Sequence, residues 1–198
     1  MTKAKIIFII GVLIIAFSIV LGLIYFLPRK EKTPIMQNIE VSKIESAVKL
    51  LDFSKINSEF SFSAKIPKKF EAEYIPQLKA INIYNPSLDG QTNTEKSQIY
   101  ITIFRADRFL TLHTVEITQQ DKIFVSGKEA ILYEITKKEN TPNFTGQPVW
   151  RNFKHRAIDV RNSKDNPSYF YSFAQNPNLS QKIFDEFINS LIFTNPNI

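Results

Sequence analysis

Residues 6–27 form an uninterrupted apolar run (IIFIIGVLIIAFSIVLGLIYFL) without a charged side chain. Two lysines precede the run within a short tail at residues 1–5, and three basic residues follow it within a polar linker at residues 28–41. As an α-helix the run would extend roughly 33 Å, about the thickness of the hydrocarbon core of a bilayer. The sequence therefore predicts a single transmembrane helix at residues 6–27.

The alternative to a permanent anchor is a signal peptide that is removed after export. A cleavable signal has a shorter apolar core, roughly 7 to 15 residues, followed by small residues at the cleavage site. The run here is longer and ends in Tyr25, Phe26, Leu27 and Pro28. The chain also has no cysteine that could carry a lipid anchor. We therefore expect the helix to be retained as a signal anchor.

The orientation in the membrane does not follow from the flanking charges. Two lysines and the α-amino group on one side nearly balance three basic residues on the other. Long domains translocate largely regardless of flanking charge, and a short basic head before an apolar run is how export signals begin. We therefore favour an N-terminus inside and an extracytoplasmic domain, with the bilayer and an envelope or membrane protein as partners.

The net charge of +6 at first suggests a protein that binds nucleic acid. Five of the 25 basic residues and one acidic residue flank the apolar run, so the remaining chain carries 20 basic and 18 acidic residues, a net charge of +2. The one short basic segment beyond the linker, residues 151–156, is more typical of a solvated strand end. We therefore expect no nucleic-acid partner.

Residues 42–194 are expected to form one globular domain, followed by a tail at residues 195–198. Period-two alternation of apolar and polar residues predicts β-strands. These strands are expected at residues 60–67, 79–84, 97–105, 115–118, 122–125, 129–137, 155–161 and 169–174. The strand at 97–105 is apolar on both faces, which is typical of a central strand covered on both sides.

Two segments change to a helical period. Residues 43–51 place Ile44, Ala47, Val48 and Leu51 at helical spacing after a capping-box pattern. Residues 179–192 repeat apolar side chains at the same spacing and follow Asn178 and Ser180, two candidate N-cap residues. A mainly antiparallel sheet with helices at both ends of the domain sequence predicts an α+β sandwich.

The order of these elements resembles that of the PsbP-like family. The resemblance rests on two sequence segments, FSFSAKIPKKF at residues 60–70 and FDEFINSLIF at residues 184–193. Between them lie a central strand with a polar loop, a strand that follows Gly127, and a late hairpin. It implies an α/β/α sandwich with an antiparallel sheet and a binding or accessory role. It has no invariant functional motif, so it assigns no functional residue here.

Catalytic and metal sites have few candidates. The chain has two histidines and no cysteine, which excludes thiolate chemistry. His155 and Asp159 would share one strand face, but four residues span roughly 13 Å, too far for one ion unless other segments contribute. We interpret this pair as a solvated strand face. No GxSxG elbow or glycine-rich phosphate loop is present, so we expect no enzyme, cofactor or metal.

Binding is the remaining class of function. Trp150, Phe153, Tyr169 and Tyr171 would line an aromatic groove or belong to the core, and we favour the core because large aromatic residues are mostly buried. The leading hypothesis is a non-catalytic binding or accessory domain. The alternative is a small-molecule carrier or hydrolase with a site under the polar loop at residues 85–96.

Overall fold

The computed structural model describes residues 48–105, 114–163 and 169–194. The expected tails, transmembrane helix and linker lie outside these residues, as does His113. Within the described ranges, no helix combines the length and the apolar character needed to cross a bilayer. The described elements all belong to one compact unit of the chain, Ser42–Ile198.

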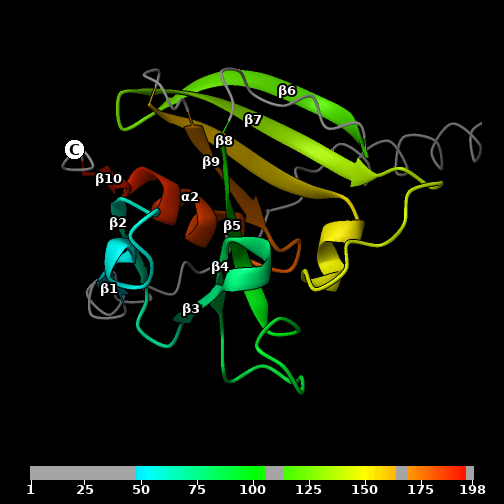
Figure 1. Ribbon diagram of the computed structural model, residues 1–198, viewed down its shortest axis with the longest axis horizontal. Helices are drawn as coiled ribbons and strands as arrows, with labels where there is room; N and C mark the ends of the chain where they lie inside the picture. Colours follow the sequence, from blue (N-terminus) through cyan, green and yellow to red (C-terminus); the bar gives the residue numbers. More distant parts are fainter. Residues whose placement is uncertain (1–47, 106–113, 164–168, 195–198) are drawn as a thin grey trace, which may run out of the picture. The chain divides into compact units, whose positions relative to one another are not determined.

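The larger sheet has seven antiparallel strands in the order β3-β4-β5-β9-β8-β7-β6 (Figure 1). The strands are β3 (Glu71–Ile75), β4 (Ala80–Tyr84), β5 (Ser97–Phe104), β6 (Val115–Val125), β7 (Lys128–Lys137), β8 (His155–Ser163) and β9 (Tyr169–Gln175). The predicted hairpin of two late strands is confirmed as β8 and β9, which pair directly.

A second sheet of three strands and several short helices complete the unit. The small sheet has the order β1-β2-β10, and both pairs are antiparallel. Its strands are β1 (Val48–Asp52), β2 (Phe62–Pro67) and β10 (Ile192–Phe193), and the helices are η3 (Phe53–Lys55), η4 (Pro76–Leu78), η5 (Val149–Asn152) and α2 (Gln181–Asn189).

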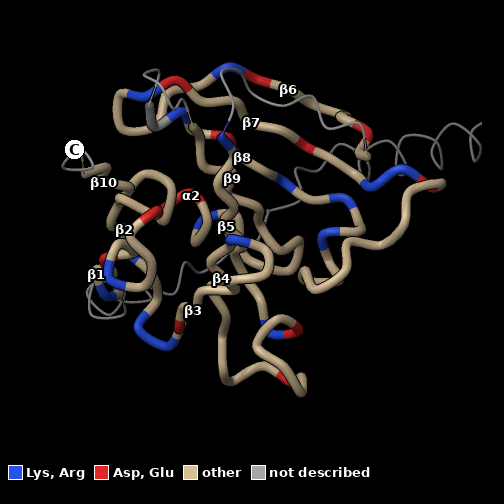
Figure 2. Tube along the Cα trace, viewed as in Figure 1, with Lys and Arg blue, Asp and Glu red and all other residues tan. Residues whose placement is uncertain are grey.

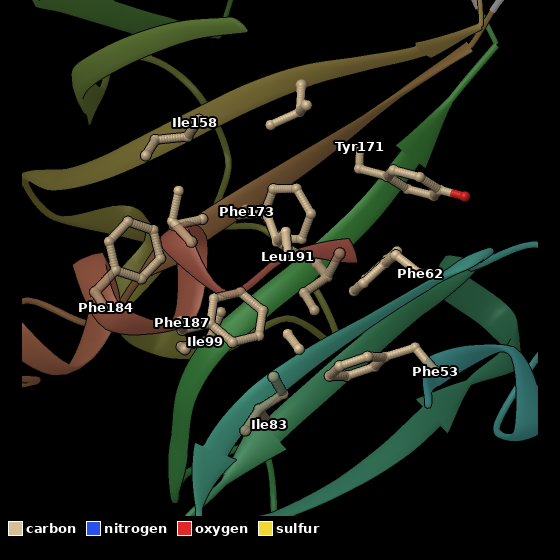
Figure 3. Packing of buried hydrophobic residues seen from close by; sticks show 14 of the residues in the cluster. Phe53, Phe62, Ile83, Ile99, Ile158, Tyr171, Phe173, Phe184, Phe187 and Leu191 are labelled. Carbon is tan, nitrogen blue, oxygen red and sulfur yellow. The ribbon is translucent and has the colours of Figure 1, made fainter. Parts of the chain in front are cut away.

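The main core lies where α2, the small sheet and one face of the large sheet meet (Figure 3). Alternation along β2 buries Phe62, Ala64 and Ile66, and the helical period of α2 buries Phe184, Phe187 and Ile188. Aromatic rings fill much of this space. Phe62 packs edge-on against Phe173 of β9 with ring centroids 5.5 Å apart. The apolar side chains that alternate along β2 and repeat along α2 therefore face a common core.

The edge strand β6 is long and polar. Seven consecutive residues, Glu116 to Lys122, are exposed, and three of them are charged, namely Glu116, Asp121 and Lys122 (Figure 2). Charged side chains on an exposed edge oppose pairing with a further strand. β6 turns into β7 through Ser126 and Gly127, whose φ angles of 49° and 76° match the two-residue turns preferred in hairpins.

Several predicted elements differ from the structure. The helix expected at residues 43–51 is wrong from Val48 onward, where strand β1 begins; the first residues of the expected helix lie outside the described chain. β1 pairs with β2 along its whole length, and this pairing outweighs a weak local helical period. The two short strands expected at 115–118 and 122–125 are one strand, β6, with a register shift between Ile117 and Gln119.

The last helix is confirmed but is shorter than expected. α2 ends at Asn189, and β10 then pairs with β2. Ser180 is its N-cap residue, but the side chain makes no capping hydrogen bond. Strand β3 was not predicted, although Ala72 and Tyr74 alternate there with Glu71 and Glu73.

The α+β class and the mainly antiparallel sheet are confirmed. The part of the chain that the structure describes contains one α-helix, α2. The two helical layers of an α/β/α sandwich are therefore not shown by these residues.

Candidate functional site

The face of the large sheet opposite the main core carries a second, more polar cluster. Tyr100 points to this face because its neighbours Ile99 and Ile101 belong to the main core. The strand register places Tyr100 beside Ala174, Ala174 beside Ala157, and Ala157 beside Tyr133. Two tyrosines on β5 and β7 are thus separated by two alanines, and the small side chains leave room for a covering segment.

The covering segment is the loop between β7 and β8, which ends in η5. Pro148 precedes the first turn, and its carbonyl accepts a hydrogen bond of 3.0 Å from the Arg151 amide. Trp150 packs in the small apolar cluster of Tyr100 and Ala174, while Phe144 packs in the cluster of Tyr133 and Ala157.

Arg151 lies among aromatic rings on this face. Its guanidinium carbon is 5.2 Å from the ring centroid of Tyr100 and 5.9 Å from that of Phe144, which are cation–π distances. Its Nη1 donates a hydrogen bond to Gln147 Oε1. Burial lowers the pKa of Arg151 to about 10, and the nearby Tyr100 and Asp159 act in the opposite direction. The side chain therefore stays positively charged at neutral pH.

His155 begins β8 and is 3% exposed. Its Nδ1 is 2.7 Å from the Phe153 carbonyl oxygen, and its ring lies edge-on to Trp150 with centroids 5.5 Å apart. Burial lowers the pKa of His155 to about 4, so the imidazole is neutral at pH 7. A neutral ring whose Nδ1–H donates to a carbonyl has its lone pair on Nε2. His155 therefore offers an acceptor to this face.

Asp159 lies on the same strand face as His155 and is 4% exposed. Burial raises the pKa of Asp159 to about 7, although a hydrogen bond from Ser172 and the charge of Arg151 lower it. The interpretation of His155 and Asp159 as a solvated strand face is therefore wrong. The described residues contain no group of three or more His, Cys, Asp or Glu side chains placed to hold a metal ion.

A hollow of about 530 Å³ opens beside η5, and we name it the Trp150 hollow. Val149 and Phe153 at its rim are 64% and 62% exposed. Its full lining is Glu95, Val149, Trp150, Phe153, Lys154, Asn176, Pro177 and Asn178. The loop at residues 85–96 contributes only Glu95 to this lining. The hollow therefore contacts that loop only at Glu95, whereas the carrier hypothesis placed a site beneath the loop.

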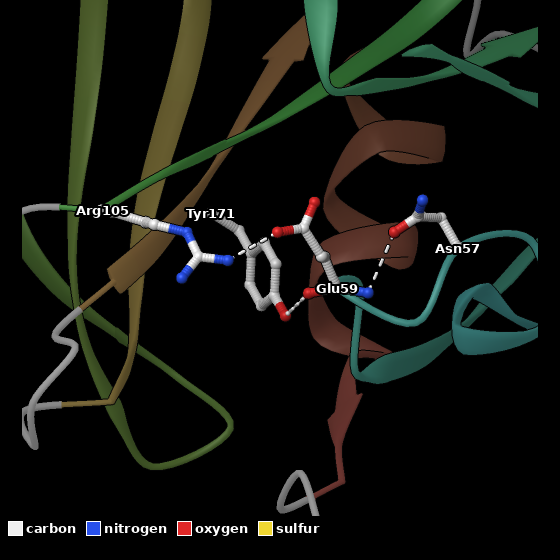
Figure 4. A network of polar contacts seen from close by, with 4 residues as sticks. All are labelled: Asn57, Glu59, Arg105 and Tyr171. Atoms are coloured by element: carbon white, nitrogen blue, oxygen red, sulfur yellow. Dashed lines mark hydrogen bonds and ion pairs between the residues drawn. The ribbon is translucent and has the colours of Figure 1, made fainter.

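The four candidate aromatic residues do not form a common groove. Tyr171 is fully buried in the main core, where its hydroxyl donates to the Glu59 carbonyl oxygen at 2.7 Å (Figure 4). The same hydroxyl accepts a hydrogen bond of 3.0 Å from the Ser61 amide. Tyr169 packs edge-on against Tyr171 with centroids 5.7 Å apart. Trp150 and Phe153 lie at the Trp150 hollow on the opposite face. The core interpretation thus fits Tyr171, while Phe153 is exposed.

Sequence reasoning missed Tyr100 and Tyr133 as members of this cluster and noted Arg151 only within a basic segment. The signal for Tyr100 is its strand, which is apolar on both faces and therefore needs a covering segment. The two alanines that align with it belong to β8 and β9, and only the strand order brings them beside Tyr100.

No family model and no curated protein matches this chain. Solved structures that are similar at low identity include the following two. The first, a crystal structure of a protein from Bacteroides thetaiotaomicron VPI-5482, is 11% identical with a TM-score of 0.38 over 68% of this chain and 46% of that one. This chain thus matches about half the length of the Bacteroides protein. The solution structure of cyanobacterial PsbP from Synechocystis sp. PCC 6803 is 10% identical with a TM-score of 0.45 over 75% and 93%.

Proposed function

We propose that the protein is a membrane-anchored, extracytoplasmic binding domain without catalytic activity, and that it contacts an envelope or membrane protein through the Trp150 hollow. Membership of the PsbP-like family is part of this proposal. The apolar run at residues 6–27 supports the anchor, and the linker of 14 residues supports a partner near the bilayer surface.

The observation that carries the proposal is the exposure of Val149 and Phe153 around the Trp150 hollow. Both side chains are more than three-fifths exposed, and they flank the only tryptophan of the chain. Protein interfaces commonly combine an apolar, aromatic-rich centre with a polar rim. Here Lys154 and Asn178 supply polar groups at the border of the hollow. The surface has the composition of a recognition site.

The small-molecule carrier is a second candidate because of the size of the hollow. A volume of about 530 Å³ falls within the range of roughly 300–1,000 Å³ that is typical of ligand pockets. A hydrolase would need a nucleophile beside a base. Among the described residues, no serine or threonine hydroxyl is hydrogen-bonded to His155. We therefore propose binding, and no hydrolytic role, for this hollow.

Cross-linking in membranes tests the proposed surface. The full chain would be cross-linked in intact membranes, solubilised in detergent and purified, with a Val149→Asp/Phe153→Asp double variant in parallel. Two buried carboxylates would disfavour an apolar contact, so the double variant should lose the cross-linked partner. Phe124→Asp is the matched control, because Phe124 is 77% exposed on β6, away from the hollow.

The result has two clear outcomes. Loss in the double variant with retention in Phe124→Asp supports the surface. An unchanged cross-linking pattern in all three proteins, or no reproducible partner for the wild type, contradicts it.

The side of the membrane is tested separately by adding protease to intact cells. Degradation of the domain without lysis is expected, and protection until lysis would place the domain inside.

A further inference from the structure

Four buried polar atoms in one small region have no hydrogen-bond partner. They are Tyr100 OH, Trp150 Nε1, Arg151 Nε and His155 Nε2. The four side chains adjoin one another: Arg151 lies over the Tyr100 ring, the Trp150 ring contacts the His155 ring, and Trp150 and Tyr100 pack in one cluster. Buried polar groups in native proteins nearly always have a partner, and exceptions mark a bound water, an ion or a functional role. This concentration therefore calls for an occupant.

The chemistry of the four atoms indicates which occupant fits. The indole and the guanidinium can only donate hydrogen bonds, and the tyrosine hydroxyl can donate as well. His155 Nε2 is the one atom of the four that can only accept, because the His155 Nδ1 is engaged with the Phe153 carbonyl oxygen. Donors outnumber acceptors, and the one permanent charge is the positive charge of Arg151. The matching group is rich in acceptors and negatively charged.

Asp159 is the internal competitor for Arg151. The two residues form no direct ion pair, although the charge of Arg151 lowers the pKa of the Asp159 carboxyl. Asp159 instead accepts a hydrogen bond from Ser172, and its burial favours the protonated form. Arg151 forms no ion pair with any other described residue. Its one described side-chain hydrogen bond is to the neutral amide of Gln147. The guanidinium therefore lacks a counter-ion within the described chain.

We propose that Tyr100, Trp150, Arg151 and His155 form a binding site for an oxyanion, the carboxylate or phosphate group of a ligand whose body occupies the Trp150 hollow. Trp150 lines the hollow and belongs to the buried cluster, so it connects the two. Lys154 also lines the hollow, but its ammonium pairs with Glu134 at 2.7 Å, so the positive charge of the site is that of Arg151. This inference deepens the proposed function, because it names the ligand chemistry of the same hollow.

Tryptophan fluorescence tests the site directly, because Trp150 is the only tryptophan in the chain. The full chain in non-ionic detergent would be titrated with inorganic phosphate and, separately, with acetate, at constant ionic strength balanced by chloride. A saturable change is expected for at least one anion. A response to phosphate alone assigns a phosphate group, and a response to acetate alone assigns a carboxylate.

Two variants and one control locate the response. Arg151→Met should abolish it, and Tyr100→Phe, which removes one hydroxyl, should weaken binding about tenfold. Arg156→Met is the matched control, since Arg156 also lies over an aromatic ring, that of Phe184, but pairs with Asp185 of α2 on the opposite face. The control should bind like the wild type.

Two results would overturn the proposal. The first is a wild type without a saturable response to either anion, which would mean that the cluster holds water only. The second is a response that persists in Arg151→Met. Circular dichroism checks that Arg151→Met is folded. If that variant is unfolded, the weaker binding expected for Tyr100→Phe is the test of the site. Failure here leaves the cross-linking result at Val149 and Phe153 standing, so the two proposals fail separately.

Discussion

The two buried titratable residues of β8 should give the protein opposing pH dependences that conceal each other. Asp159 has a folded pKa raised from 3.8 to about 7, so its favourable contribution is present below pH 3.8 and is lost as the pH rises towards 7. His155 has a folded pKa lowered from 6.5 to about 4, so its contribution is present above pH 6.5 and is lost as the pH falls towards 4.

The two effects have similar sizes. The raised pKa of Asp159 corresponds to about 4 kcal/mol in the free energy of unfolding, and the lowered pKa of His155 corresponds to about 3 kcal/mol. Each residue changes this free energy by about 1.4 kcal/mol per pH unit where only one state titrates. Arg151 and Tyr133 act electrostatically on Asp159, and Arg151 acts on His155.

Single substitutions should separate these effects. Relative to wild type, Asp159→Asn should gain about 2–3 kcal/mol of unfolding free energy between about pH 4.5 and about pH 6.5, because only the histidine dependence remains. His155→Gln should lose a similar amount over the same interval. Denaturant unfolding of the full chain in detergent, followed by Trp150 fluorescence, measures both. An Asp159→Asn protein with the wild-type pH profile would show that the carboxyl is solvated, and would refute the reasoning.

Four further substitutions test the core, the exposed edge strand and one turn, each by denaturant unfolding followed by Trp150 fluorescence. Tyr171→Phe should lower the free energy of unfolding by about 2 kcal/mol, because two backbone groups before β2 lose their partner; no change would mean that water replaces the hydroxyl. Phe187→Ala should cost about 3–5 kcal/mol and Phe124→Ala less than about 0.5, and equal effects would contradict the assigned burial. Gly127→Ala should cost about 1 kcal/mol from its positive φ alone, since nothing lies within 4 Å of the added carbon; a neutral result would show that the turn adjusts.

Local periodicity in the sequence correctly indicated most of the large sheet and the last helix. Residues 97–105 and 129–137 alternate over enough positions to define strands, and β5 and β7 form there. The helical period of residues 179–192 similarly corresponds to α2. At β1 the local pattern indicated a helix instead, because a few apolar residues fall at helical spacing although the segment pairs with β2. Pairing with a distant strand leaves no mark in the local pattern.

The candidate site could be predicted from the sequence less well than the fold could. The sequence alone established the residue types, the single tryptophan, and which residues alternate on a common strand face, including His155 and Asp159. It could not show that this face is covered, because burial depends on the segment that packs above it. Only the tertiary structure aligned Tyr100, Ala174 and Ala157 and placed Arg151 over the Tyr100 ring. Period and composition are properties of neighbours along the chain, whereas the chemistry of this site arises between strands brought together by folding.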